Sequence, residues 1–199
     1  PPWGTLILRK MLANPGFKNN FVNQYCDRIN TNFASQKIIA TTDSIRQIYV
    51  PEINQHIDRW GLNYSYYQSS IENIKTFATN RPAYARGHLK SVLGLGEMLT
   101  IKIEVKSFGT GRVKINTVIP DKYPFTGNYF KGIPIKLTAI PASGYKFLRW
   151  EMGSFISYER TIDYNMETGI TFRAIFDIAE STDNKMVINE INYNSSPQM

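Results

Sequence analysis

The chain has 199 residues, a formal net charge of +7 at pH 7 and a single cysteine. Its hydrophobic content of 42% and aromatic content of 13% are ordinary for a globular protein, which argues against disorder over most of the length. One cysteine excludes an internal disulfide, and the sequence lacks a run of about 18 apolar residues that would span a membrane.

The charge is unevenly distributed. Lys and Arg outnumber Asp and Glu mainly within residues 1–90. This bias suits an anionic partner such as phosphate, nucleic acid or a cell-wall polymer. The basic residues are scattered and include no run of four, however, which is typical of a solvated surface. We therefore expect no nucleic-acid partner.

The strongest helical pattern in the chain covers Asn14–Phe33. Asn14 is a good N-cap, Pro15 suits the first helical position, and Cys26 is interpreted as an unreactive core residue. At about 100° per residue, apolar and polar side chains occupy opposite halves of the helix. The apolar half holds Phe17, Phe21, Val22, Tyr25, Cys26, Ile29 and Phe33, and the polar half holds Asn19, Asn20, Asn23, Asp27, Asn30 and Thr31.

Further helices are predicted on both sides of this central one. Pro51 lies inside an apolar pattern whose phase continues across it, so a kink or two abutting helices are expected there. Arg81-Pro82 marks a second kink or a new start. The expected helices are Leu6–Leu12, then Ile45–Trp60 with caps at Thr41–Asp43 and an end at Gly61, and a last helix from Ser69 or Ser70 to Leu93.

Two features of this half are candidate functional groups. His56 lies on the apolar face of its predicted helix and is interpreted as a core histidine, because no second ligand stands at useful spacing. The segment Asn63–Tyr67 is predicted to be a loop that carries Tyr64, Tyr66 and Tyr67. Three tyrosines in a loop either form a stacking platform for a ligand or fix the loop onto the helices. They are the only candidate binding residues that the sequence singles out.

After Gly94-Leu95-Gly96 the apolar residues recur at every second position instead of with a helical period. Pro120–Gly132 is expected to be a long loop, and Tyr145, Phe147 and Trp150 are expected in the core. The pattern predicts a small antiparallel β domain. Its expected strands are Met98–Val105, Arg112–Ile119, Ile133–Ile140, Tyr145–Glu151, Tyr158–Asn165 and Ile170–Asp177.

The predicted fold class is α+β in two segments, an all-α N-terminal segment and then a small all-β antiparallel domain. We expect the helical segment over 1–94 and the β domain over 97–180. Residues 181–199 are expected to form a linker and a lone strand, Met186–Tyr193. Such a strand either adds to the β domain or begins another one.

Several motifs in the helical half resemble a known family. They are LRKMLANPGFKNNFVNQYCDRINTNF, then IYVPEINQHIDRWG, then SIENIKTFATNRPAYARGHL. Together they are similar to the C-terminal helical part of CotH-type kinase proteins, the spore coat protein H family, over roughly residues 5–93. The resemblance implies an atypical secreted kinase whose nucleotide-binding lysine and acidic metal motif lie upstream of the matched helices.

The second half resembles a divergent InlB-type B-repeat, a β module of bacterial surface proteins. The matching residues are GRVKIN, GNYFKG and LTAIP, followed by GYKF, Trp150 and AIF. The segment VINEINY is similar to the first strand of a lamin-tail-like domain. The resemblance to a B-repeat implies a spacer or adhesion role.

No stretch of the sequence matches a catalytic motif of the kinase family. It has no Gly-rich phosphate loop and no D-x-D motif. We expect no catalytic residue, no metal site and no cofactor in this chain. Its first residue is Pro1 and no signal peptide is recognisable, which suggests a fragment or a processed product.

Three hypotheses follow from the resemblance. The first is a non-catalytic segment of a secreted or surface CotH-like bacterial protein, with a structural or interaction role toward an upstream kinase lobe. The second is an atypical kinase in the intact parent protein. The third is a cell-wall or carbohydrate-binding module that uses the tyrosines. The expected partners are the kinase lobe and a surface protein or polysaccharide, and exposed apolar surface would also suit a homo-oligomer.

Overall fold

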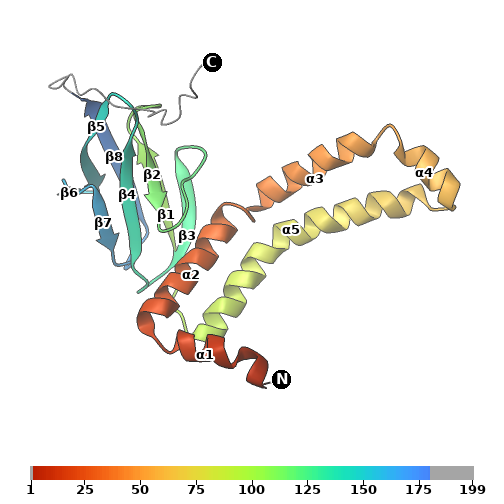
Figure 1. Cartoon of the computed structure of the whole chain (residues 1–199), viewed down its shortest axis with the longest axis horizontal. Helices are drawn as coiled ribbons and strands as arrows, with labels where there is room; N and C mark the ends of the chain where they lie inside the picture. The colour runs from red at the N-terminus through yellow and green to blue at the C-terminus, as the bar shows by residue number, and fades with distance from the viewer. Residues whose placement is uncertain (1, 180–199) are drawn as a thin grey trace, which may run out of the picture.

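The computed structural model describes residues 2–179, and the predicted strand Met186–Tyr193 lies outside this range. A helical N-terminal segment is followed by a β domain, as the sequence predicts (Figure 1). The last helix ends at Leu93 and is followed by Gly94, which has a left-handed backbone conformation. The first strand begins at Met98. The change of period in the sequence therefore coincides with the change of architecture.

The central helix, α2 (Pro15–Asn30), lies against the β domain (Figure 1). Its first turn is capped as predicted, because Asn14 Oδ1 accepts the Phe17 N–H at 3.0 Å. The helix ends at Asn30, three residues before the predicted end, and Phe33 is exposed.

Helices α3 and α4 and the first part of α5 form an arm that projects away from the β domain, whereas α1 lies at its base (Figure 1). The third helix begins at Ser35, so the predicted caps at Thr41–Asp43 were wrong and lie inside it. Pro51 separates two helices, and Gly61 ends the second in a left-handed conformation. The helical elements are η1 (Pro2–Thr5), α1 (Leu6–Leu12), α2 (Pro15–Asn30), α3 (Ser35–Tyr49), α4 (Ile53–Trp60) and α5 (Tyr64–Leu93).

Two sheets make up the β domain. One has the strand order β3-β1-β8-β5-β6 and the other β2-β4-β7. All pairings are antiparallel except β1 with β8, where Ile101 lies beside Ile170 in parallel register. The strands are β1 (Met98–Val105), β2 (Gly111–Ile115), β3 (Phe125–Phe130), β4 (Ile135–Pro141), β5 (Tyr145–Met152), β6 (Phe155–Ser157), β7 (Thr161–Tyr164) and β8 (Ile170–Ile178).

The sequence missed β3, which lies inside the predicted loop Pro120–Gly132, and the short β6. A Cβ on Gly127 would lie 2.9 Å from the Phe125 ring and 3.2 Å from Asn30 Nδ2. Glycine in mid-strand thus permits the close approach of α2, although it weakens the strand signal in the sequence. The predicted Arg112–Ile119 strand is shorter because Asn116 turns the chain with a positive φ of 45°.

The hydrophobic core lies between the two sheets and extends into α2 and the end of α5. Trp150 is fully buried as predicted, and Phe147 packs beside it with ring centroids 5.6 Å apart. Val22, Cys26 and Leu89 join the strand residues in the same cluster. The division of the chain into independent domains stays a prediction, since one core includes residues from both segments.

Candidate functional surfaces

The polar side of α2 contacts the β domain through hydrogen bonds of Asn23, Asp27 and Asn30, here called the seam. Asp27 is fully buried, and its carboxylate accepts four hydrogen bonds. Oδ1 accepts the Tyr129 hydroxyl at 2.8 Å and Asn116 Nδ2 at 3.1 Å. Oδ2 accepts the Thr117 hydroxyl at 2.7 Å and the Thr117 N–H at 3.1 Å. A buried charge is tolerable only with such partners.

Asn30, one turn further along α2, joins the helix to β3 through its side-chain amide. Nδ2 donates to the Asn128 carbonyl at 3.0 Å, and Oδ1 accepts the Asn128 N–H at 3.1 Å. The same Oδ1 accepts Nη2 of Arg86 at 2.8 Å, which connects α5 to the seam. Burial lowers the pKa of the Arg86 guanidinium. Asn23 adds a bond of 2.6 Å to the Pro134 carbonyl.

The seam shows that the polar half of α2 is also partly buried. Asn23 and Asp27 are buried, while Val22, Cys26 and Ile29 on the apolar side are buried as expected. The helix therefore has two buried sides. One signal could have indicated this, because solvent faces favour Lys and Glu whereas this side of α2 carries four amides, an aspartate and a threonine.

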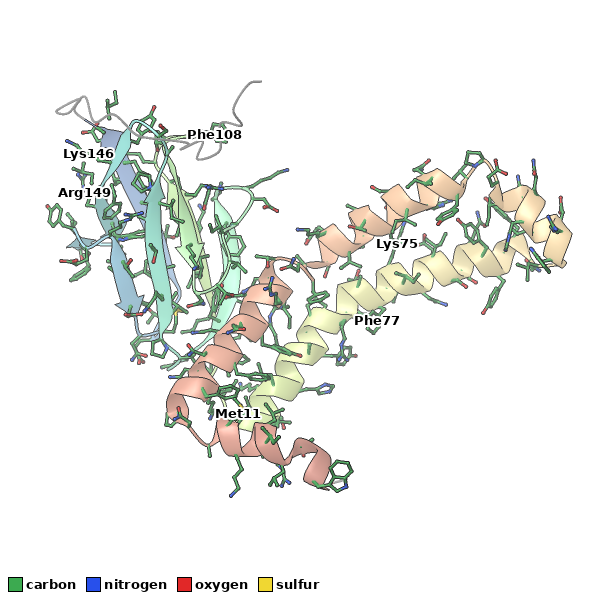
Figure 2. All side chains as sticks on the ribbon, viewed as in Figure 1. Met11, Lys75, Phe77, Phe108, Lys146 and Arg149 are labelled. Carbon is green, nitrogen blue, oxygen red and sulfur yellow. The ribbon has the colours of Figure 1, made fainter. Side chains whose placement is uncertain are left out.

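The arm, by contrast, exposes aromatic side chains. Tyr66, Phe77 and Tyr84 on α5 are 74%, 63% and 64% exposed. Their spacings of 11 and 7 residues are close to three and two helical turns, so the three side chains lie along one line, here called the α5 stripe. Lys75 points to α3, where it pairs with Asp43 at 2.7 Å, and Phe77 lies on the other side of α5 (Figure 2).

The three predicted tyrosines are close together at the start of α5. They form its first turn and not a loop, because Asn63 Oδ1 caps the helix by accepting the Ser65 N–H at 2.7 Å. The rings of Tyr64 and Tyr67 lie 6.0 Å apart at an angle of 42°. Tyr66 points away into solvent and belongs to the α5 stripe. Their role in binding stays a prediction.

The predicted core position of His56 was wrong, since this side chain is exposed at the outer end of the arm. Within residues 2–179, no group of three His, Cys, Asp or Glu residues is arranged to hold a metal ion. Over the same range, no helix has both the length and the apolar character needed to cross a membrane.

Cys26 is buried in the core, and burial raises the pKa of its thiol to about 12. We expect the native protein to resist thiol reagents up to pH 9 and to react quickly once unfolded, because the thiolate is the reactive form. Absorbance-monitored labelling with a disulfide reagent, in buffer and in urea, measures both rates. Fast labelling in buffer at pH 8 would contradict the buried position.

Comparison with known proteins gives two family matches. Residues 1–85 match the model described as CotH kinase protein. Residues 109–180 match the model described as divergent InlB B-repeat domain. Searches of the curated proteins and of the solved structures gave no match. The matched segments are those that the sequence motifs indicate, so the resemblance to both families is confirmed.

Proposed function

We propose that these helices bind and support the kinase lobe of a CotH-like surface protein, and that this chain itself is non-catalytic. The observation that carries the proposal is the α5 stripe, a line of exposed aromatic residues within the segment that matches a kinase family. The matched families both suggest an extracellular or surface protein. In such a protein the β domain would serve as a spacer.

The exposed apolar surface of the helices continues beyond the α5 stripe. None of the residues of α1 or α3 is buried. Exposed apolar surface on this scale suits contact with a partner. Large apolar residues at least 40% exposed on these helices and their connections are Trp3, Leu6, Ile7, Leu8, Met11, Phe33, Ile45, Ile48, Tyr49, Val50, Trp60, Leu62, Tyr64, Tyr66, Ile74, Phe77, Tyr84 and Val92.

The seam explains how a projecting arm can hold a partner in a fixed position. Asp27 and Asn30 anchor α2 to the β domain. Arg86 ties α5 to Asn30, and Lys18 Nζ donates to the Leu93 carbonyl at 2.8 Å near the end of α5. The base of the arm is thus fixed by polar contacts, while exposed apolar side chains lie along its whole length. This arrangement suits a support for another lobe.

Hydrogen exchange tests the proposal. We expect backbone amides of α1 and α5 to exchange more slowly in a version of the protein extended upstream of Pro1 than in the 199-residue chain, since a docked lobe would suppress local opening. The strands of the β domain serve as an internal control, because their rates should not change. Equal rates in α5 of both proteins would rule out docking on this surface.

A carbohydrate-binding role is the second candidate, and the paired rings of Tyr64 and Tyr67 favour it. If this role is correct, changing Tyr64, Tyr66 and Tyr67 together to Ala abolishes binding to isolated cell-wall polysaccharide in a pull-down. The Tyr158→Ala variant is the control, because Tyr158 is as exposed as Tyr66 but lies in the β domain. Unchanged binding by the triple variant would remove the tyrosines from consideration.

A further inference from the structure

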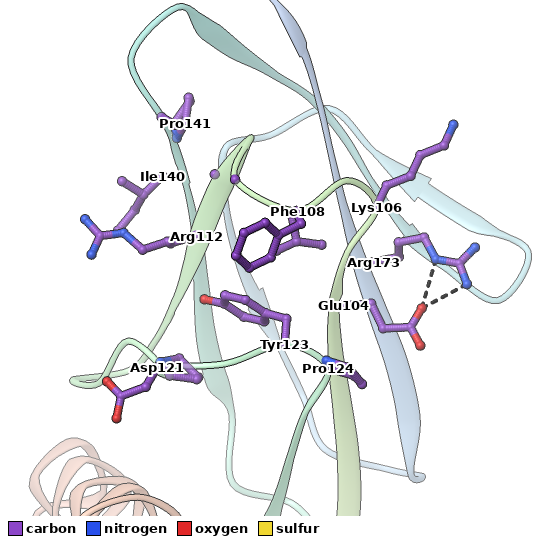
Figure 3. A pocket seen from close by; sticks show the side chains of 15 residues that line it. Glu104, Lys106, Phe108, Arg112, Asp121, Tyr123, Pro124, Ile140, Pro141 and Arg173 are labelled. Atoms are coloured by element: carbon purple, nitrogen blue, oxygen red, sulfur yellow. Dashed lines mark hydrogen bonds and ion pairs between the residues drawn. The ribbon is translucent and has the colours of Figure 1, made fainter.

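A pocket of about 640 Å³ opens at one end of the β domain. It lies where the turn between β1 and β2 meets the segment that leads into β3 (Figure 3). Its volume is within the range of small-molecule sites, about 300–1,000 Å³. Apolar side chains line much of it, namely Phe108, Pro120, Tyr123, Pro124, Ile140 and Pro141.

Two aromatic rings occupy the centre of this pocket (Figure 3). The Tyr123 hydroxyl accepts the Val113 N–H at 2.7 Å and donates to the Val113 carbonyl at 3.1 Å. These bonds fix the Tyr123 ring before any ligand arrives. Phe108, at the turn between β1 and β2, is fully exposed. The whole Phe108 ring is therefore open to contact with a ligand.

Two of the basic side chains around the rings have no acidic partner among the described residues. Arg112 lies on one side of the rings and Lys106 on the other (Figure 3). Neither forms an ion pair with another of the described residues 2–179. The pocket's acids already have partners. Glu104 pairs with Lys102 at 2.7 Å and with Arg173 at 2.9 Å, and Asp121 is 3.7 Å from Lys37.

We propose that this pocket binds an acidic polysaccharide. A sugar ring packs its C–H face on Phe108 and Tyr123, and carboxylates of the polymer bind Arg112 and Lys106. A neutral glycan would leave both cations without a partner. This site lies on the β domain and does not depend on the role of the helices in holding a kinase lobe.

The test is a calorimetric titration of the 199-residue chain with an eight-unit oligogalacturonate at low salt. We expect saturable binding, which Phe108→Ala weakens about tenfold. Arg112→Gln is expected to weaken it about fivefold and to reduce its salt dependence. Both side chains are exposed, so the variants should fold, and their unfolding curves check this.

Matched controls separate a specific site from general attraction to a basic protein. Lys114→Gln removes one charge from an exposed position two residues from Arg112 on β2, and Tyr158→Ala removes an exposed ring outside the pocket. Both should bind like the wild type. Equal losses in the controls, absence of binding, or tighter binding to oligothymidylate than to oligogalacturonate would each overturn the proposal.

Discussion

The Asp27→Ala variant should lose about 3–5 kcal/mol of unfolding free energy, the largest effect expected from any single change in the seam. The substitution leaves the Tyr129 hydroxyl, Asn116 Nδ2 and the Thr117 donors without their common acceptor inside the protein. Tyr129 is fully buried, and a buried donor without an acceptor costs about 1–3 kcal/mol, whereas the half-buried Asn116 and the exposed Thr117 lose less. Urea unfolding followed by circular dichroism measures the change.

A control and a double-mutant cycle make this result specific. Gln24→Ala changes an exposed residue of the same helix and should shift stability by less than about 0.5 kcal/mol. Tyr129→Phe removes one donor, so its effect should be smaller in the Asp27→Ala background than in the wild type. A loss below about 1 kcal/mol in Asp27→Ala would show that α2 does not depend on this carboxylate.

The second large effect is expected from the α5 stripe. In a version of the protein extended upstream of Pro1, Phe77→Ser combined with Tyr84→Ser should lower the rate of phosphate transfer from ATP at least tenfold. Two aromatic anchors at a docking surface are each worth about 1–2 kcal/mol. Their loss would release the lobe that they hold. A filter-binding assay with radiolabelled ATP measures the rate.

The unfolding free energy of the same two substitutions in the 199-residue chain is the control, because it separates a loss of docking from a loss of folding. Both side chains are more than 60% exposed, so unfolding free energy should change by less than about 0.5 kcal/mol. Tyr158→Ser, on the β domain, should leave both the rate and the stability unchanged. If the double variant keeps full activity, the α5 stripe is not the docking surface.

Local signals in the sequence were enough to predict most elements. Asn14 and Pro15 identified the start of α2, and strict alternation identified β1 with its observed bounds. The start of α5 was missed because its first turn is rich in tyrosine, although Asn63 is a good N-cap. His56 was misplaced because only Ile57 of its apolar neighbours on α4 is buried, while Trp60 on the same predicted face is exposed.

The candidate sites depend on contacts between distant parts of the chain, and the sequence could not predict these. Asp27 meets Thr117 and Tyr129 only after α2 docks on the β domain. β3 forms by pairing with β1, although Gly127 and Asn128 at its centre disfavour a strand. The pocket likewise joins Phe108 to Tyr123 across a turn and a loop. Hydrophobic period and secondary-structure propensity predict single helices and strands, but they do not predict which of these elements contact each other.

Phosphate transfer from ATP, with Mg²⁺ or Mn²⁺, tests most directly whether these helices support chemistry that lies elsewhere. The assay compares the 199-residue chain with the protein extended upstream of Pro1 under identical conditions. Our account predicts transfer by the extended protein and none by the 199-residue chain. Any transfer by the isolated 199-residue chain would contradict it.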